Sequence, residues 1–151
     1  MKGRIGRKLW PLLLVAAWLA PAWSSDTPWR GSGGWGAGLP YQQLFNQRNI
    51  ETISGVIRSI DRLAPRQGMS EGFTLSVTVQ NRQVTVHLGP VWFLERQDLP
   101  LGVGDKVEIN GSRVKSKGKS FLIATRLSKR DQALELRDAQ GFPRWSGWHK
   151  R

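Results

Sequence analysis

Apolar and polar residues alternate through the middle of the chain. In residues 73–79 and 84–88 every second position is Phe, Leu or Val, and the positions between them carry Thr, Ser or His. A period of two residues is that of a β-strand with one buried and one solvated face. The polar pair Asn81-Arg82 separates the two segments, so we predict a hairpin.

Further strands flank this hairpin. Residues 50–61 are rich in β-branched side chains and contain Gly55, which predicts a first strand with a bulge or a sharp bend. The alternation around Val107 and Ile109 predicts a fourth strand, and residues 121–127 predict a fifth strand after a turn at Gly118. Residues 133–138 would add a sixth, short strand.

The stretch between the third and fourth strands combines a strand stop with a short helix. Gly89-Pro90 ends the third strand, because proline has no N–H to donate to a ladder, and residues 91–95 fit one helical turn. Five strands with this insertion and a bent first strand match the OB-fold, a small Greek-key barrel. We therefore predict an all-β domain over residues 49–140, whose open end Trp92 and Phe93 plug.

Three segments flank the predicted domain. Residues 1–22 combine four positive charges, a short apolar run and small residues at the end, which indicates a signal peptide or, alternatively, a retained anchor. Residues 23–48 are rich in Gly and Ser, and we expect a flexible tether whose Trp29 and Trp35 are exposed or loosely docked. Residues 141–151 form an aromatic and basic tail, in which we expect Trp145 to pack on the domain. An exported chain of this kind would be periplasmic or secreted.

Positive charge gathers in the last third of the sequence. The formal net charge is +12, and residues 113–151 carry eleven Lys or Arg against three acids. These cations are either a solubilising surface or a docking surface for a polyanion, such as nucleic acid, lipid headgroups or acidic polysaccharide. The candidate contacts are Arg113, Lys115, Lys117, Lys119, Arg126, Lys129 and Arg130, with Arg144, Trp148, Lys150 and Arg151 in the tail.

Catalysis or metal binding by this protein would depend on His87. The alternation places Val86 and Leu88 inward, so His87 points outward, among hydroxyl side chains. We interpret it as a surface residue, because a general base needs an orienting carboxylate or a nucleophile and a metal needs three or four ligands. The other histidine, His149, lies close to the C-terminus. The same outward face carries no Phe, Tyr, Trp, Lys or Arg, so bases would not stack there as on many OB-folds.

Composition narrows the function further. The chain has no cysteine, which excludes disulfides, thiolate metal sites and covalent haem attachment through Cys-x-x-Cys-His. No catalytic residue, metal ligand set or cofactor site is apparent, so we expect a protein that is not an enzyme and needs no cofactor.

Four segments carry a resemblance to a known group. "SGVIRSID", "VHLGPVWFLE", "GDKVEINGSRV" and "LELRDAQGFPRWSG" resemble small exported bacterial OB-fold proteins, related to the periplasmic bacterial-OB-fold stress proteins. Some similar proteins are labelled DNA-binding and some are associated with magnetosomes. The resemblance covers residues 50–148 and implies a non-enzymatic binding or assembly module, with no catalytic residues to carry over.

Two functions remain open on this basis. The first is an exported OB-fold module that contacts an anionic partner through the basic hairpin and the tail. The second is a structural or protein-interaction module of the cell envelope, in which the charge only solubilises. An enzyme or a metal-binding protein would need partners for His87 that the sequence does not supply.

Overall fold

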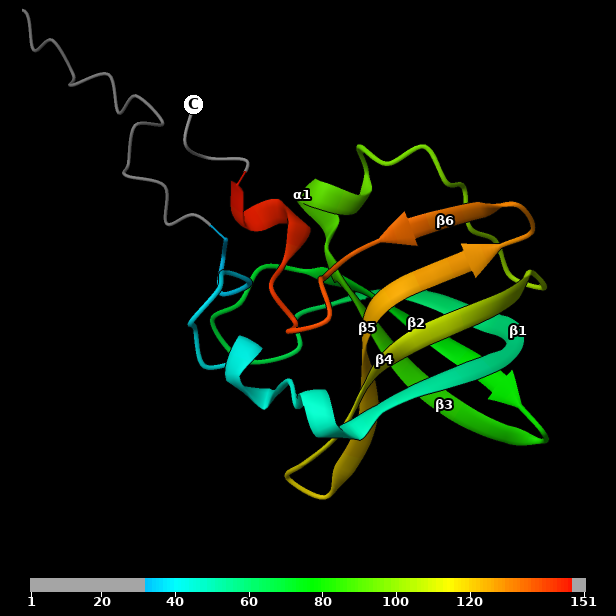
Figure 1. Cartoon of the computed structure of the whole chain (residues 1–151), viewed down its shortest axis with the longest axis horizontal. Coiled ribbons are helices and arrows are strands. Elements are labelled where there is room, and N and C mark those ends of the chain that lie inside the picture. The colour runs from blue at the N-terminus through cyan, green and yellow to red at the C-terminus, as the bar shows by residue number, and fades with distance from the viewer. Residues whose placement is uncertain (1–31, 148–151) are drawn as a thin grey trace, which may run out of the picture.

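The strands form one sheet that curves back on itself (Figure 1). The structure is a computed structural model and describes residues 32–147. Its strand order is β3-β2-β1-β4-β5-β6, and a short parallel pairing of β3 with β5 brings the two sides of the sheet together. The strands are β1 (Ile50–Leu63), β2 (Gly72–Val79), β3 (Arg82–Pro90), β4 (Lys106–Ser116), β5 (Lys119–Lys129) and β6 (Gln132–Glu135).

The long strand β1 serves two neighbours in turn. Its first half, up to Val56, pairs with β4, and from Val56 onward it pairs with β2. Gly55 stands at this change of partner, and a Cβ atom there would overlap the carbonyl oxygen of Thr78. The predicted bulge or bend has its counterpart a few residues beyond Gly55, where the register with β2 shifts between Ile57 and Ser59.

The predicted hairpin and the predicted short helix are both present. The turn between β2 and β3 lies at Gln80 and Asn81, which have φ values of 47° and 64°. Positive φ at both central residues is typical of the type I′ turns that connect twisted strands. The helix α1 (Val91–Leu94) follows Pro90 directly and buries Phe93, whereas Trp92 is half-buried.

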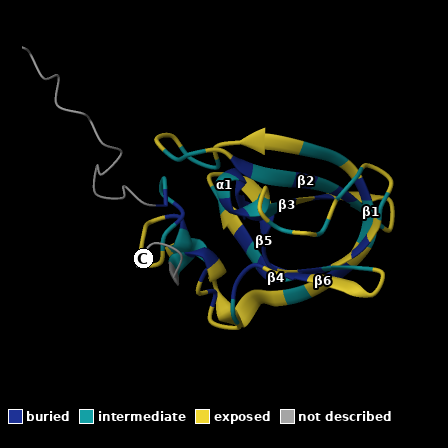
Figure 2. Ribbon diagram, turned by 90° about the horizontal axis from the view of Figure 1, so that it is seen from above, coloured by how far each residue is buried: buried dark blue, intermediate teal, exposed yellow. Residues whose placement is uncertain are grey.

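The predicted all-β, barrel-like class is confirmed. The described residues contain six strands, because the short segment expected from residues 133–138 forms β6 over Gln132–Glu135. In Figure 2 the strands surround a buried interior, and the exposed residues lie mainly on the outer side and at the turns. This interior is filled by fully buried aliphatic side chains, among them Leu75, Val77, Val86, Ile109, Leu122 and Leu127.

Two segments distant in sequence cover one end of the barrel together. Trp35 is 1 % exposed and Trp145 is 1 % exposed, and the Trp145 indole Nε1 donates to the Trp35 carbonyl oxygen at 2.8 Å. The expectation that Trp145 packs is confirmed. The expectation for Trp35 is wrong, because its ring fits over Gly72 and its Nε1 donates to the Ser70 carbonyl oxygen at 3.0 Å. Residues 32–48, within the segment expected to be a tether, thus contribute to the core.

Gly72 provides the space in which Trp35 sits, so substitution there should be costly. A Cβ atom at Gly72 would overlap the Trp35 ring. We expect Gly72→Ala to lower the free energy of unfolding by about 1–3 kcal/mol, as overpacking does in cores. The matched control is Gly102→Ala, whose added Cβ meets only an Asp105 carboxylate oxygen at 3.7 Å. Urea unfolding of both variants measures the difference, and equal stabilities would contradict the docking of Trp35.

Candidate functional site

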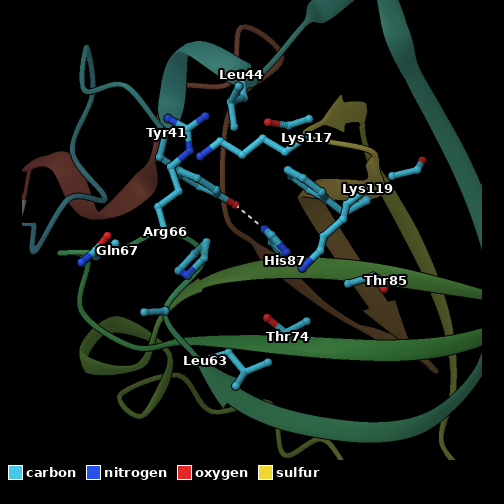
Figure 3. A pocket seen from close by; sticks show the side chains of 15 residues that line it. Tyr41, Leu44, Leu63, Arg66, Gln67, Thr74, Thr85, His87, Lys117 and Lys119 are labelled. Carbon is cyan, nitrogen blue, oxygen red and sulfur yellow. Dashed lines mark hydrogen bonds between the residues drawn. The ribbon is translucent and has the colours of Figure 1, made fainter.

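A pocket of about 880 Å³ lies on the outer face of the β2–β3 hairpin (Figure 3). Thr74, Thr85 and His87 of that hairpin form part of its lining. The connection after β1 borders it on one side and the turn between β4 and β5 borders it on the other. The remaining lining residues are Tyr41, Leu44, Leu63, Ala64, Pro65, Arg66, Gln67, Ser116, Lys117, Lys119, Ser120 and Phe121.

His87 is not the surface residue that the alternation pattern predicts. Its ring is stacked on Phe121 of β5, with centroids 4.2 Å apart, and the Tyr41 ring lies nearly parallel to it with centroids 5.9 Å apart. The Tyr41 hydroxyl lies 2.8 Å from His87 Nδ1, the dashed contact in Figure 3. The side chain points outward from the barrel as predicted, but Tyr41 and Phe121 cover it and also bring aromatic rings to a face that was expected to lack them.

The environment of this pair fixes its protonation. Burial, and the positive charge of Arg137 as a smaller cause, lower the pKa of His87 to about 4. Burial raises the pKa of Tyr41 well above its usual value, although the nearby Arg137 and Arg66 oppose this shift. Both groups are therefore neutral at neutral pH. The direction of their hydrogen bond depends on which ring nitrogen of His87 carries the proton.

Arg137 is buried and acts electrostatically on both members of this pair. Its guanidinium Nη1 donates to the carbonyl oxygens of Leu88, at 2.9 Å, and of Ala124, and the group stacks on the Trp145 ring at 4.8 Å. Burial lowers its pKa to about 10, so the group is charged at neutral pH. Nε and Nη2 have no hydrogen-bond partner among the described residues. A positive charge is thus buried close enough to Tyr41 and His87 to act on both, and among the described residues it forms no ion pair.

Three further cations lie at the mouth of the pocket: Arg66, Lys117 and Lys119, called the mouth cations below. Arg66 comes from the connection after β1, and Lys117 and Lys119 come from the β4–β5 turn (Figure 3). In Figure 3 the Lys117 side chain reaches toward Arg66, and that of Lys119 extends toward His87. The lining contains no Asp or Glu, and within residues 32–147 none of these three cations forms an ion pair.

The other predicted cations lie in different settings. Arg113 pairs with Glu51, Arg126 with Glu135 at 3.1 Å, and Lys129 with Asp105 at 2.8 Å. The structure therefore brings Lys117 and Lys119 together with Arg66, and it neutralises three of the other candidates internally. Lys115 is exposed on β4 outside the pocket lining, and Arg130 follows β5. Arg144 is exposed in the 3₁₀ turn Arg144–Gly147. The remaining candidates, Trp148, Lys150 and Arg151, lie outside the described residues.

Sequence reasoning missed Tyr41, Arg66 and Arg137. Tyr41 is the single tyrosine of the chain and directly follows the Gly-rich stretch, a local signal that an ordered segment begins there. Arg66 lies in a connection without any periodicity, and Arg137 follows directly after the alternating residues of the last strand. No local pattern marks either arginine as part of a site.

The described residues hold neither a metal-binding cluster nor a membrane-spanning helix. Residues 32–147 contain no group of three or more His, Cys, Asp or Glu side chains arranged to hold a metal ion. They also contain no helix with the length and apolar character needed to cross a bilayer.

Comparison with known proteins adds the family. The MamS/MamX magnetosome protein family matches residues 49–134, which include all of β1 to β5 and most of β6. The chain belongs to the MamS/MamX magnetosome protein family. The matched range covers Arg66, His87, Lys117 and Lys119, whereas Tyr41, Arg137 and Trp145 lie outside it. Membership confirms the magnetosome-associated part of the resemblance. No curated protein matches the chain.

Proposed function

We propose that this member of the MamS/MamX family is an exported, non-enzymatic binding module of the OB type that holds an anionic partner in the pocket beside His87. The observation that carries the proposal is the meeting of Arg66, Lys117 and Lys119 around a pocket whose lining has no carboxylate. Like charges placed together without counter-charges repel each other, and an anion between them removes that repulsion.

The topology supports the OB assignment. OB-folds bind ligands on the face of strands 2 and 3, between the connection of strands 1 and 2 and the connection of strands 4 and 5. The pocket occupies the corresponding place, since Thr74 and Thr85 line it from β2 and β3 and the two cationic segments border it. The parallel pairing of Val86 with Leu122 closes the barrel between β3 and β5.

The internal ion pairs argue against a purely solubilising role for the three mouth cations. Arg113 and Lys129 each have an acidic partner within the fold, with side chains 30 % and 18 % exposed. The cations at the mouth have none in the described part of the chain, although acids are present elsewhere on the surface. Other exposed cations, such as Arg82, Lys106 and Lys115, also lack an ion pair among the described residues, but they lie outside the pocket lining. Three cations around one pocket whose lining has no acid favour a docking role over solubility alone.

The chemistry of the lining supports binding without catalysis. Its one imidazole, that of His87, is hydrogen-bonded to Tyr41 and has a pKa of about 4, so it is a weak base at neutral pH. No carboxylate of the lining could orient it or act beside it as an acid. General acid–base catalysis needs such a partner and a pKa near the working pH.

Neutralising Arg66, Lys117 and Lys119 should strongly weaken binding to polyanions. We expect the triple variant Arg66→Gln, Lys117→Gln, Lys119→Gln to bind heparin or single-stranded DNA about 100-fold more weakly at low salt, and to lose about two units of the salt slope, because three contacts are removed. The matched control carries Arg82→Gln, Lys106→Gln and Lys115→Gln, which remove the same charge from exposed positions outside the pocket lining.

The control separates a site from a general charge effect. Fluorescence anisotropy between about 50 and 500 mM salt measures both variants, since counterion release makes such binding salt-dependent. A control that weakens binding as much as the triple variant would show that only net charge matters. Unchanged binding in the triple variant would leave the envelope-interaction role, in which charge solubilises, as the better proposal.

A further inference from the structure

We infer that the pocket takes an organic phosphomonoester, whose phosphoryl group lies between the mouth cations and the Nε2–H of His87, with Tyr41 holding His87 in the donating tautomer. This inference rests on the proposed function and names the class of anion and the residue that recognises it at the base of the pocket.

The hydrogen bond with Tyr41 sets the tautomer of His87. The buried Tyr41 hydroxyl has no described acceptor other than His87 Nδ1, at 2.8 Å. Because tyrosine keeps its proton here, Nδ1 must carry a lone pair, and the proton of the neutral ring is on Nε2. Stacking on Phe121 and the contact with the Tyr41 hydroxyl hold the ring plane in place.

The Nε2–H of His87 is available to a ligand. Within residues 32–147 His87 Nε2 has no hydrogen-bond partner. The fully enclosed side-chain polar atoms without a partner belong to Ser70 and Arg137, so Nε2 keeps some contact with solvent. His87 lines the pocket and the Lys119 side chain extends toward it (Figure 3). A fixed, unpartnered N–H beside an ammonium group is a donor for an anionic oxygen.

The cations and hydroxyls of the lining indicate the charge and shape of the anion. Arg66, Lys117 and Lys119 line the pocket, and the buried Arg137 adds positive charge that is felt at His87. A carboxylate or a phosphodiester carries one negative charge, whereas a phosphomonoester carries about −1.5 to −2 at neutral pH and three acceptor oxygens. The hydroxyls of Thr74, Thr85 and Ser120 supply further donors around the same space.

The volume of the pocket and its apolar residues indicate that the anion carries an organic group. The pocket volume of about 880 Å³ is within the range of roughly 300–1,000 Å³ that holds drug-sized ligands, so an inorganic phosphate ion would leave most of it to water. Part of the lining is apolar and offers no donor to an oxyanion; it consists of Leu44, Leu63, Ala64 and Pro65. An apolar or aromatic body attached to the phosphoryl group would pack against some of these side chains.

Calorimetric titration of the chain with phenyl phosphate, inorganic phosphate and benzoate tests the ligand class. We expect phenyl phosphate to bind at least about tenfold more tightly than either of the others. Vesicles containing phosphatidic acid, against vesicles containing phosphatidylglycerol, show whether a lipid headgroup can supply the same monoester. Equal affinity for benzoate and phenyl phosphate would overturn the phosphomonoester assignment.

Three variants test the role of His87. His87→Phe keeps a stacked ring without a donor, and we expect it to bind phenyl phosphate about tenfold more weakly, the size of one charge-assisted hydrogen bond. His87→Gln places an amide N–H near the Nε2 position and should recover affinity to within about threefold of the parent chain. Tyr41→Phe frees Nδ1, so the ¹⁵N shifts of His87 should change from one tautomer to a mixture.

The outcomes separate this inference from the proposed function. If His87→Phe binds phenyl phosphate like the parent chain while the Arg66, Lys117, Lys119 triple variant does not, the role of His87 is wrong and the anion site stands. If DNA or heparin binds through the mouth cations but phenyl phosphate does not, the ligand class is wrong. If no anion binds through those cations, the proposed function fails as well. A mixed tautomer in the parent chain would remove the role of Tyr41.

Discussion

Replacing Trp145 with alanine is expected to lower the free energy of unfolding by about 3–5 kcal/mol, the range found for aromatic-to-alanine changes in cores. The indole is 1 % exposed and lies 5.2 Å from the Phe93 ring and 6.3 Å from the Trp35 ring, centroid to centroid. Its loss would leave a cavity over Gly89, whose missing side chain makes room for the ring. It would also expose the buried Arg137 guanidinium, which it covers at 4.8 Å.

Phe142 provides the control within the same tail. Its side chain is 55 % exposed, so we expect Phe142→Ala to change stability by no more than about 0.5 kcal/mol. Urea unfolding followed by far-UV circular dichroism is the suitable measurement, because it does not depend on the fluorescence of the removed tryptophan. Similar losses in the two variants would mean that the tail does not seal the barrel at Trp145.

The contact between Trp35 and Trp145 is an example of what could not be predicted from the sequence. Two-residue alternation predicts β2 and β3 because it is a local consequence of one buried face, and Gly55 predicts the bend in β1 for an equally local reason. Trp35 stands in a Gly- and Ser-rich stretch, whose composition is typical of a flexible linker. Its burial depends on Gly72, which is distant in sequence and makes room for the ring. A contact of that kind has no local signal.

The same distinction applies to the pocket. Lys117 and Lys119 could be predicted because their cations alternate in one hairpin without an acid between them. The pattern could not separate them from Arg113 and Lys129, since the acids Glu51 and Asp105 that neutralise those two come from other strands and connections. Nor could it assign His87 a role, because the residue that fixes its tautomer, Tyr41, lies 46 positions away.

Acid should destabilise the fold through His87 by up to about 3 kcal/mol between pH 6.5 and about pH 4. The folded-state pKa is about 4 and the usual value is 6.5. In that window the unfolded chain binds a proton at this position and the folded chain does not, so protonation favours the unfolded state. The stability is complete above pH 6.5, declines as the pH falls, and declines no further from this group below about pH 4. Burial and Arg137 cause the shift, and the cations Arg66, Lys117 and Lys119 around the pocket act in the same direction.

The variant His87→Phe isolates this contribution, because every other titrating group is common to both chains. Asp105, whose pKa is lowered by its bonds to Lys129 and the Gly102 N–H, titrates at lower pH in both, and His149 is also shared. We expect the parent chain to lose about 2–3 kcal/mol more than the variant between about pH 7.5 and about pH 4.5. Urea unfolding at both pH values measures this double difference, which needs no absolute stability. Parallel pH profiles for the two chains would show that His87 titrates in the folded protein as it does in water, and that Tyr41 and Phe121 do not enclose it.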